Sequence, residues 1–485
     1  MSSPLRGQIH YTLDGTIPTS NSPIYTQPFD VSQSAILQTA VFVNDNLQTN
    51  IQSHDFFINA KHNMPIVSIN LPPESLWDDE IGIYVEGNHK NYLQTGSDWE
   101  RSAWMRWYEP DHKLGFERLI GLRLHGNAMR GMPQKAFRIY VRDEQGREVK
   151  LTYPLFGEAG NRQHSSFVLR NSSSDMAHTF MRDRLASELV QQSDSNLDTQ
   201  SARPVVLYLN GQYWGLYYLR ERFDETYFSE KYQVDPELLS IVEVPLNNAE
   251  KRGQAISDSK KSQADADLYN QLLSDIRRCR DCVDFNHLDR LVDTNNLIDY
   301  FLFEFFFANA DWPYNNTKAW RYRSPTNQPV ESQLQPELDG RFRWLLFDVD
   351  VGFGAGRDST EKMIKVANNN PYTNFEDHAF PFRNMFFNQT FQQHWQARLN
   401  ELTANVLSQR NLVQTAEALA AEIRPEMSRH IERWGKEAAQ DGVDSVDSLT
   451  EWEVQVELLK DFLRTRTAAF QDHTQEFIKN SHNIP

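Results

Sequence analysis

The spacing of apolar residues changes once along the chain, near residue 223, and this change limits the folds that the chain can adopt. Before it, short segments alternate apolar and polar residues, which is typical of half-buried β-strands. After it, apolar residues recur mainly at helical spacing, and residues 391–480 follow that pattern throughout. Strands and helices in separate runs predict an α+β chain rather than alternating βα units.

The length of the chain requires more than one folded part. It has 485 residues, whereas a single hydrophobic core rarely organises more than about 250. A hydrophobic content of 39% and an aromatic content of 12% exclude a disordered chain. We expect a small β module over residues 1–58, a main domain over 63–390, and a helical C-terminal extension over 391–485 that packs on the main domain.

The main domain is expected to begin with strands and one helix. Alternation predicts strands at residues 120–125, 136–141, 166–170, 204–209 and 213–219, and two later short strands near 318–322 and 342–347. Helical spacing predicts one helix over 179–191, and Asn210-Gly211 predicts a hairpin turn after it. Trp104 and Trp107 fall on a further expected strand, where core packing is more frequent than stacking on sugars.

Charge and apolar runs exclude two kinds of partner. The chain carries 49 Lys and Arg residues against 66 Asp and Glu residues, a net charge of −17 that repels phosphate backbones. Because no long run of Lys and Arg interrupts this pattern, we predict that the chain does not bind nucleic acid. No run of 18 apolar residues occurs, so we also predict no transmembrane segment.

The two cysteines, Cys279 and Cys282, lie three residues apart. Such a pair resembles a redox motif or half of a zinc site. However, no second Cys/His pair lies nearby at zinc spacing, and no βαβ pattern surrounds the pair. We interpret them as two ordinary thiols, with a local disulfide as the alternative.

Two acidic clusters carry the residues best suited to chemistry. Asp311 follows a strongly apolar helix and precedes Asn316 by five residues. Asp348 and Asp350 end an apolar strand and lead into a glycine-containing segment. Each cluster alone has an ordinary structural explanation, because Asp-Trp-Pro commonly ends a helix and Asn-Asn commonly forms a turn.

The order and spacing of the two clusters match the needs of phosphoryl transfer. That reaction requires a carboxylate beside the attacking hydroxyl, oxygen ligands for magnesium, and a cation on the phosphates. Protein kinases place an Asp and an Asn five residues apart in one loop, and a magnesium-binding Asp after a later strand. Asp311, Asn316 and Asp348 repeat that order here.

The chain resembles the spore-coat protein H (CotH) kinase family, an atypical branch of the kinase-like fold, over roughly residues 63–435. The segments that carry the resemblance, besides the two acidic clusters, are Gly121-Leu-Arg-Leu-His-Gly126-Asn127, Pro133-Gln-Lys135-Ala-Phe-Arg138, Leu169-Arg-Asn, Met181-Arg182-Asp, and Tyr208-Leu-Asn210-Gly211-Gln-Tyr-Trp-Gly215-Leu-Tyr217 with Glu221. The chain departs from the family at Gln134, where a second basic residue is frequent, and at Phe347, where Trp is frequent.

The resemblance implies a fold and a reaction. The fold is an atypical protein-kinase-like, two-lobed one, preceded by a small β-sandwich-like module and followed by a helical C-terminal region. The reaction is ATP- and Mg2+-dependent transfer of phosphate to a hydroxyl of a protein or a glycan. Asp311 matches the catalytic carboxylate, and Asn316 and Asp348 match the magnesium ligands. We group Asp350, the second acid of the motif, with these ligands.

The resemblance also suggests residues that contact the nucleotide. Lys135 ends a glycine-containing loop between two strands, and we choose it as the phosphate-contacting cation. Arg130 and Arg138 are weaker candidates for the same contact. Glu221 follows the hairpin, where a nucleotide contact and a structural ion pair are equally reasonable interpretations.

Two other classes of protein remain as alternatives. A carbohydrate-active hydrolase would use two of the carboxylates as an acid and base about 5–10 Å apart. Its candidates are Asp311, Asp348, Asp350 and Glu221. Such an enzyme gives Asn316 and Lys135 no role. The other alternative is a catalytically inactive kinase-like protein with a surface or structural function.

The N-terminal module has its own signature. The run Tyr11-Thr-Leu-Asp-Gly-Thr-Ile-Pro-Thr19, followed by Ser22-Pro-Ile-Tyr25, resembles the C-terminal-type module of chitobiase and β-hexosaminidase. We interpret it as a structural spacer, with carbohydrate attachment as the alternative, and expect residues 1–58 to be dispensable for folding of the rest. Because only ten residues precede Tyr11, we expect a truncated chain, or one whose start was assigned too late.

The module also bears on where the protein acts. Modules of this kind often follow a secretion signal, which we expect to be missing upstream of this chain. We therefore expect an extracellular or cell-surface protein, with the cytoplasm as the alternative location. Association with the cell envelope or with a polysaccharide is a further expectation.

Overall fold

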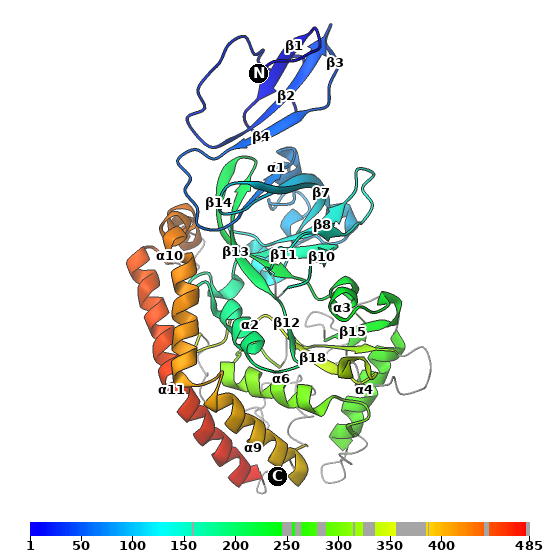
Figure 1. Ribbon diagram of the computed structural model, residues 1–485, viewed down its shortest axis with the longest axis vertical. Helices are drawn as coiled ribbons and strands as arrows, with labels where there is room; N and C mark the ends of the chain where they lie inside the picture. The colour runs from blue at the N-terminus through cyan, green and yellow to red at the C-terminus, as the bar shows by residue number, and fades with distance from the viewer. Residues whose placement is uncertain are drawn as a thin grey trace. The chain divides into compact units, whose positions relative to one another are not determined.

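The computed structural model describes residues 1–157, 160–244, 255–257, 263–278, 288–313, 316–323, 335–355, 385–386, 388–440 and 446–481 (Figure 1). Cys279 and Cys282 lie outside the described residues. The chain forms two compact units. We call them the barrel unit (Met1–Ser173, Ala202–Glu221 and Ile423–Leu449) and the acidic-loop unit (Ser174–Ser201, Arg222–Glu422 and Thr450–Pro485).

The barrel unit begins with a small antiparallel sheet. Strand β2 (Ala35–Val43) pairs with β1 (Gln8–Thr12), β3 (Asn46–Leu47) and β4 (Gln52–Phe56). The two-residue turn between β2 and β3 uses Asn44 and Asp45 at positive φ (49° and 62°), residue types that tolerate this conformation. Most of β2 is buried, so this strand forms the centre of the module.

Seven strands of the barrel unit close on one another. In spatial order they are β11 (Ser166–Arg170), β14 (Gln212–Glu221), β13 (Ala202–Leu209), β5 (Ile66–Asn70), β6 (Arg101–Tyr108), β7 (Leu114–Leu124) and β8 (Phe137–Arg142), and β8 pairs again with β11. All neighbours are antiparallel except β13 and β5. Alternate residues face inward, as Phe137, Ile139 and Val141 do on β8, and these side chains form the core of the barrel.

Short elements complete the barrel unit: α1 (Glu74–Trp77), the 3-10 helices η1 (Asn91–Leu93), η2 (Ser97–Trp99) and η3 (Ala128–Gly131), and the strand pair β9 (Leu151–Thr152) and β10 (Gln163–His164). The pleat of β6 separates its two tryptophans. Trp107 faces the core and is fully buried, whereas Trp104 is 42% exposed on the outer face. The expected core packing therefore holds for Trp107 and is wrong for Trp104.

A buried carboxylate attaches the N-terminal module to the barrel. Asp55 of β4 accepts hydrogen bonds from Ser68 Oγ (3.0 Å) and Tyr108 OH (2.7 Å), and it pairs with Arg106 at 3.4 Å. The Asp55 side chain is 1% exposed. Burial and the neighbouring Asp55 carboxylate raise the pKa of Tyr108. Glu117 is a second partner of Arg106, at 3.2 Å.

The acidic-loop unit contains a five-stranded sheet with helices around it. The strand order is β12 (Asp198–Thr199), β18 (Arg343–Leu346), β17 (Lys318–Tyr322), β15 (Leu239–Glu243) and β16 (Ile256–Ser257), and only β12 and β18 pair in parallel. Its helices are α2 (Arg182–Gln192), α3 (Glu225–Tyr232), α4 (Gln263–Arg278), α6 (Thr294–Phe307), α9 (Gln389–Ala404), the first part of α10 (Gln409–Gln440), and most of α11 (Leu449–Ser481). Three short 3-10 helices are η4 (Ser173–Asp175), η5 (Pro236–Leu238) and η6 (Pro336–Leu338).

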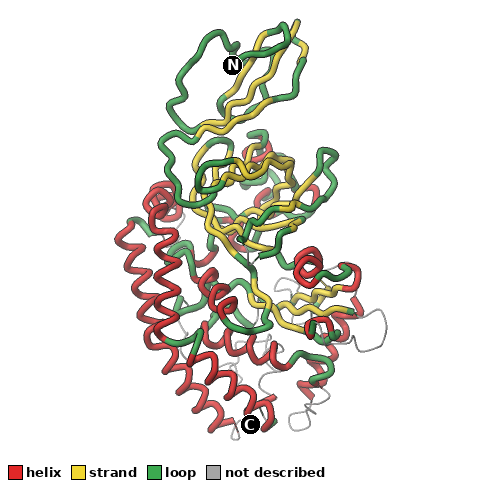
Figure 2. The backbone as a smooth tube through the Cα atoms, viewed as in Figure 1, coloured by secondary structure: helices red, strands yellow, loops and turns green. Residues whose placement is uncertain are grey.

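The main sequence expectations about secondary structure are confirmed. The chain is α+β, with strands mostly early in the sequence and helices at the end. Figure 2 shows both kinds of element. The helix expected from residue 179 begins three residues later, at Arg182, because Asp175 accepts hydrogen bonds from the Thr179 and Arg182 amides and Phe180 adopts a positive φ. No helix in the described part of the chain is long and apolar enough to cross a membrane.

Candidate active site

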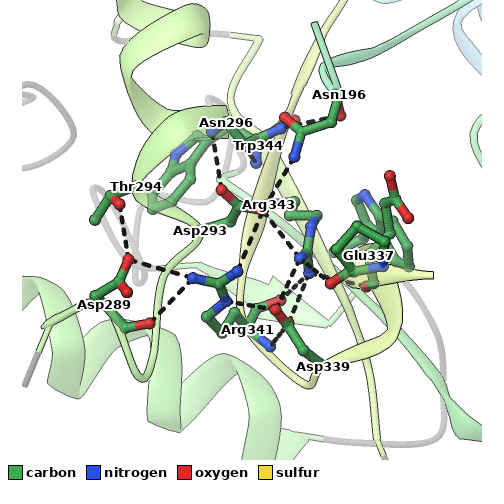
Figure 3. Close-up of polar contacts among 12 residues, drawn as sticks. Asn196, Asp289, Asp293, Thr294, Asn296, Glu337, Asp339, Arg341, Arg343 and Trp344 are labelled. Atoms are coloured by element: carbon green, nitrogen blue, oxygen red, sulfur yellow. Dashed lines mark hydrogen bonds and ion pairs between the residues drawn. The ribbon is translucent and has the colours of Figure 1, made fainter. Parts of the chain in front are cut away.

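A set of polar contacts aligns the start of helix α6 with the start of strand β18 (Figure 3). Asp293 caps the helix by accepting a hydrogen bond from the Asn296 amide (3.1 Å), and it pairs with the fully buried Arg343 at 2.9 Å. The Asn296 side chain accepts from Trp344 N (2.7 Å) and donates to Trp344 O (3.3 Å), as a neighbouring strand would. Asp339 also pairs with Arg343, at 3.0 Å. These contacts fix the register of α6 on β18.

The other ends of α6 and β18 lead into two loops that contact each other. We call them the α6 loop (residues 308–313 and 316) and the β18 loop (residues 347–354). Ala310 N donates to Val351 O (3.2 Å), and Phe353 N donates to Phe307 O, the last residue of α6 (2.6 Å). The first residues of α6 and β18 are also bonded to each other, as described above. The packing of this helix on this strand therefore brings the two acidic clusters together.

Asn316 and Asp348, two of the predicted metal ligands, are in direct contact. The Asn316 amide nitrogen donates to the backbone carbonyl of Asp348 at 3.3 Å. Both residues are half-buried, and both have positive φ, 59° and 61°. Phe353 also has positive φ (52°), which is unusual for a bulky residue. Non-glycine residues in this conformation concentrate where the surrounding structure enforces a particular loop shape.

Asp350 has a backbone partner that the sequence did not predict. Its side chain, on a residue that is 3% exposed, accepts a hydrogen bond from Ser174 N at 2.9 Å. Asp183, at the start of α2, accepts from Val349 N at 3.0 Å. The β18 loop is therefore fixed by the segment that precedes α2 and by the first turn of that helix.

The backbone of Asp311 is held by buried polar side chains. Asp311 N donates to Asn309 Oδ1 (3.3 Å), and Asn309 Nδ2 donates to Glu304 Oε2 (3.0 Å). Asn309 and Glu304 are fully buried, whereas Asp311 is half-buried. Sequence reasoning missed both supporting residues, although a glutamate inside an almost wholly apolar helix was a signal that a buried polar partner exists. The neighbouring Trp312 is anchored to Tyr300 OH at 2.7 Å.

Lys135, in the barrel unit, donates to the loop that carries it. Its Nζ atom donates to the carbonyls of Arg130 (2.7 Å) and Met132 (2.9 Å). The ammonium group lies over the rings of Tyr84 and Tyr92, at 5.1 and 4.8 Å from their centroids, and the residue is 5% exposed. These contacts give Lys135 a part in shaping the loop.

Arg130 and Arg138 form a small cationic group beside Lys135. Burial, followed by the charge of Arg138, lowers the pKa of Arg130. Arg138 Nη2 donates to His125 Nδ1 at 3.1 Å, and Arg130 Nη1 donates to Gln94 O at 2.9 Å. In the part of the chain that the structure describes, no carboxylate lies within ion-pair distance of either arginine.

Glu221 ends strand β14 and is 3% exposed. Its Oε1 atom accepts a hydrogen bond from Asn161 N at 3.0 Å. The predicted site residues thus form two groups. Lys135, Arg130, Arg138 and Glu221 belong to the barrel unit, and Asp311, Asn316, Asp348 and Asp350 belong to the acidic-loop unit. Among the described residues, no three His, Cys, Asp or Glu side chains are arranged to hold a metal ion.

Comparison with known protein families assigns most of this chain. Residues 122–470 match the family model described as CotH kinase protein, and the chain belongs to the CotH kinase family. Residues 2–56 match the model described as Fn3 associated. The resemblance of this segment to the chitobiase-type module stays a prediction. No curated protein matches the chain.

Proposed function

We propose that this chain is an atypical kinase of the CotH type, with a kinase-like two-lobed fold, that transfers phosphate from ATP to a hydroxyl of a protein or glycan in the presence of Mg2+. The observation that carries the proposal is the pairing of the α6 loop with the β18 loop. It joins Asn316 to Asp348 and places Asp311 on the same pair of loops. Both loops lie inside the family match.

The residues of these loops fit a magnesium–nucleotide complex. Magnesium prefers oxygen ligands, and Asn316, Asp348 and Asp350 offer one amide oxygen and two carboxylates. Asn316 uses its amide nitrogen on Asp348 O, and we assign its Oδ1 atom to the metal. When bound, ATP supplies the phosphoryl group, and the metal neutralises charge that develops on it.

Asp311 takes the role of the base in this proposal. Its backbone is fixed through Asn309, while its half-buried carboxylate can receive the proton of an acceptor hydroxyl. A rigid loop that carries a partly exposed acid suits this task, because the carboxylate keeps its position as the acceptor binds.

The cations of the barrel unit are assigned to the phosphates. Arg130 and Arg138 are the stronger candidates, because no carboxylate of the described residues pairs with either and guanidinium groups suit bidentate phosphate contacts. Lys135 stays a proposed phosphate contact, and its bonds to Arg130 O and Met132 O support an additional role in holding the loop. Glu221 stays a proposed nucleotide contact.

We also propose that the protein acts outside the cell or at its surface. The Fn3-associated match over residues 2–56 is compatible with that location. Association with a cell-envelope polysaccharide belongs to the same proposal, because a glycan hydroxyl would then be an available acceptor.

The direct test uses the full chain with radiolabelled ATP and Mg2+. Candidate proteins and glycans serve as acceptors, and thermal unfolding is followed with and without Mg–ATP. We expect label transfer and Mg-dependent thermal stabilisation, and Asp348→Ala should lose both. Asp267→Asn, which changes an exposed carboxylate of α4, is the matched control and should retain both. If Asp348→Ala keeps full metal-dependent stabilisation, the ligand role passes to Asp350. A wild-type chain with neither signal overturns the proposal.

A further inference from the structure

Helix α11 carries a buried cation, Arg466, that has no counter-ion among the described residues. Arg466 is 3% exposed, and no carboxylate of the described residues lies within ion-pair distance of its guanidinium group. Its Cζ atom lies 5.7 Å from the ring centroid of Phe306 and 5.4 Å from those of Phe462 and Phe470. Burial lowers the pKa of Arg466 to about 10, so the group stays charged at neutral pH. Because burying an unpaired charge is unfavourable, its other contacts must offset this cost.

Those contacts are with the end of α6. Arg466 Nε donates to Phe306 O at 2.7 Å, and Nη2 donates to Phe305 O at 2.5 Å. The last carbonyls of a helix have no partners within the helix, and a cation is favoured there because the helix dipole is negative at this end. Phe305 O also accepts from Ala308 N at 3.1 Å, so Arg466 adds a second donor to that carbonyl and caps Phe306 O from a helix far away in the sequence.

The remaining carbonyls of the last turn are capped by the two acidic loops. Glu304 O accepts from Asn309 N at 3.3 Å, within the α6 loop. Phe307 O accepts from Phe353 N at 2.6 Å, from the β18 loop. The chain then leaves α6 through Ala308, which has a positive φ of 52° without being glycine. The direction in which the α6 loop leaves the helix thus depends on partners outside the helix, and Arg466 is one of them.

Helix α11 also contacts the β18 loop, one turn before Arg466. A Cβ atom on Gly354 would lie 3.1 Å from Phe462 Cδ2, which shows how closely the loop backbone approaches this ring. The rings of Phe462 and Phe353 pack edge to face at 6.4 Å. Arg466 therefore connects α11 to the end of α6, and Phe462 connects it to the β18 loop.

We propose that Arg466 is a positioning residue for phosphoryl transfer, because its cap on α6 sets the position of Asp311. This inference rests on the proposed function. Arg466 contacts no substrate in this scheme, and its effect reaches the reaction through the α6 loop. Removal of the guanidinium group should displace the carboxylate of Asp311 while the residues assigned to the nucleotide keep their positions.

The test compares Arg466→Met, Arg466→Lys and Arg464→Met in the full chain. Methionine fills the space among the three rings without a charge, so the variant should fold. Lysine keeps the charge with fewer directed donors. Arg464, two residues earlier on α11, is a matched control because its side chain is 40% exposed. Measurements are kcat, the KM for ATP, the Kd for Mg–ATP, and Tm.

We expect Arg466→Met to lower kcat at least tenfold while the Kd for Mg–ATP changes less than twofold. Arg466→Lys should recover part of kcat, and Arg464→Met should match the wild type. The decisive measurement is the double variant Arg466→Met with Asp311→Asn. Because Arg466 acts through Asp311, this variant should transfer phosphate no more slowly than Asp311→Asn alone.

Three results would overturn the inference. They are an unchanged kcat in Arg466→Met, a loss that adds fully to that of Asp311→Asn, and a loss that disappears when each variant is assayed equally far below its own Tm. If Arg466→Met does not fold, the same comparison is made with Arg466→Lys. An active wild type with an unaffected Arg466→Met refutes only this inference. A wild type that neither binds nucleotide nor transfers phosphate refutes the proposed function and this inference with it.

Discussion

Asp55 in the barrel unit and Asp311 in the acidic-loop unit show two different uses of a carboxylate. Asp55 is fully enclosed, and its oxygens are bound by Ser68, Tyr108 and Arg106. Asp311 is half-buried, and its position is fixed through its backbone amide and the buried Asn309. A carboxylate that its partners enclose contributes to stability, whereas a half-buried carboxylate such as that of Asp311 is accessible to a ligand.

The same contrast separates the cations of the barrel unit. Lys135 donates to carbonyls of its own loop, although its place in the sequence suggests a phosphate contact. Arg138 donates to His125 and has no carboxylate within ion-pair distance among the described residues. The position of a cation in a motif therefore indicates where its charge lies. Its hydrogen-bond partners indicate whether the charge holds a loop or is available to a phosphate.

The largest expected effect is that of Asp311→Asn on transfer. Loss of the base should reduce kcat by about 10²- to 10⁴-fold, while Mg–ATP still stabilises the protein against heat. The unfolding temperature without ligand should stay within about 2 °C of the wild type, because the hydrogen bond from the amide of residue 311 to Asn309 remains. The measurement is label transfer in parallel with thermal unfolding. A normal kcat in this variant would show that Asp311 takes no part in the reaction. A much lower Tm would show that Asp311 stabilises the fold, as Asp55 does.

Much of this comparison was accessible from the sequence, because α6 and β18 are apolar runs that each end in acidic residues. The contacts that align them were not accessible. Asn296 pairs with Trp344, and Arg466 caps Phe306, across separations of 48 and 160 residues. Local patterns fix the type of an element, whereas such long-range hydrogen bonds depend on how the elements pack. Lys135 shows the same dependence, since the Tyr84 hydroxyl that accepts a hydrogen bond from its backbone amide lies 51 residues before it.

The second prediction concerns stability rather than chemistry. Asp55→Asn should destabilise the barrel unit by about 3 kcal/mol, because breaking one side of a buried ion pair leaves Arg106 with the partly exposed Glu117 alone. Transfer by the folded protein should be unchanged. Urea unfolding measures the first effect and kcat the second. Asp111→Asn is the matched control, since its ion pair with Lys113 is exposed and its loss should have little effect.

This result also bears on the N-terminal module. Removal of residues 1–58 would remove Asp55 together with the rest of β4. We still predict that the chain without residues 1–58 folds by itself. A chain that starts near residue 60 should still unfold cooperatively, at a temperature close to that of Asp55→Asn. Aggregation of that shortened chain would instead make the module part of the folding unit.

The third prediction compares the two kinds of cation. Arg138→Gln should weaken Mg–ATP binding about tenfold with little change in Tm, because its guanidinium group supports no carboxylate of the described barrel. Lys135→Met should lower Tm, because it removes two hydrogen bonds that close the loop. Nucleotide titration by calorimetry and thermal unfolding separate the two effects. If Lys135→Met weakens Mg–ATP binding at constant Tm, Lys135 is the phosphate contact and not a residue that stabilises the loop.

The smallest effect concerns His430, which the barrel unit keeps neutral. It is 5% exposed, and its Nδ1 atom accepts a hydrogen bond from Leu216 N at 3.1 Å. Burial lowers the pKa of His430 to about 3, from an ordinary value of 6.5. As the pH falls from 6.5 towards 3, only the unfolded chain takes up this proton, so this contribution to stability is present above pH 6.5 and is lost on acidification.

The loss should reach about 1.4 kcal/mol per pH unit below pH 6. His430→Asn supplies an acceptor near the position of Nδ1 and cannot titrate, so its free energy of unfolding should fall less steeply with pH than that of the wild type. Urea unfolding at pH 7.5, 6 and 5 gives the pH dependence of the free energy of unfolding for both proteins. The difference between the two slopes cancels the contribution of the carboxylates, which titrate in both proteins. Equal slopes would mean that His430 carries a proton in the folded barrel. The Leu216 amide would then need another acceptor. The barrel would enclose the positive charge of His430, as it encloses the negative charge of Asp55.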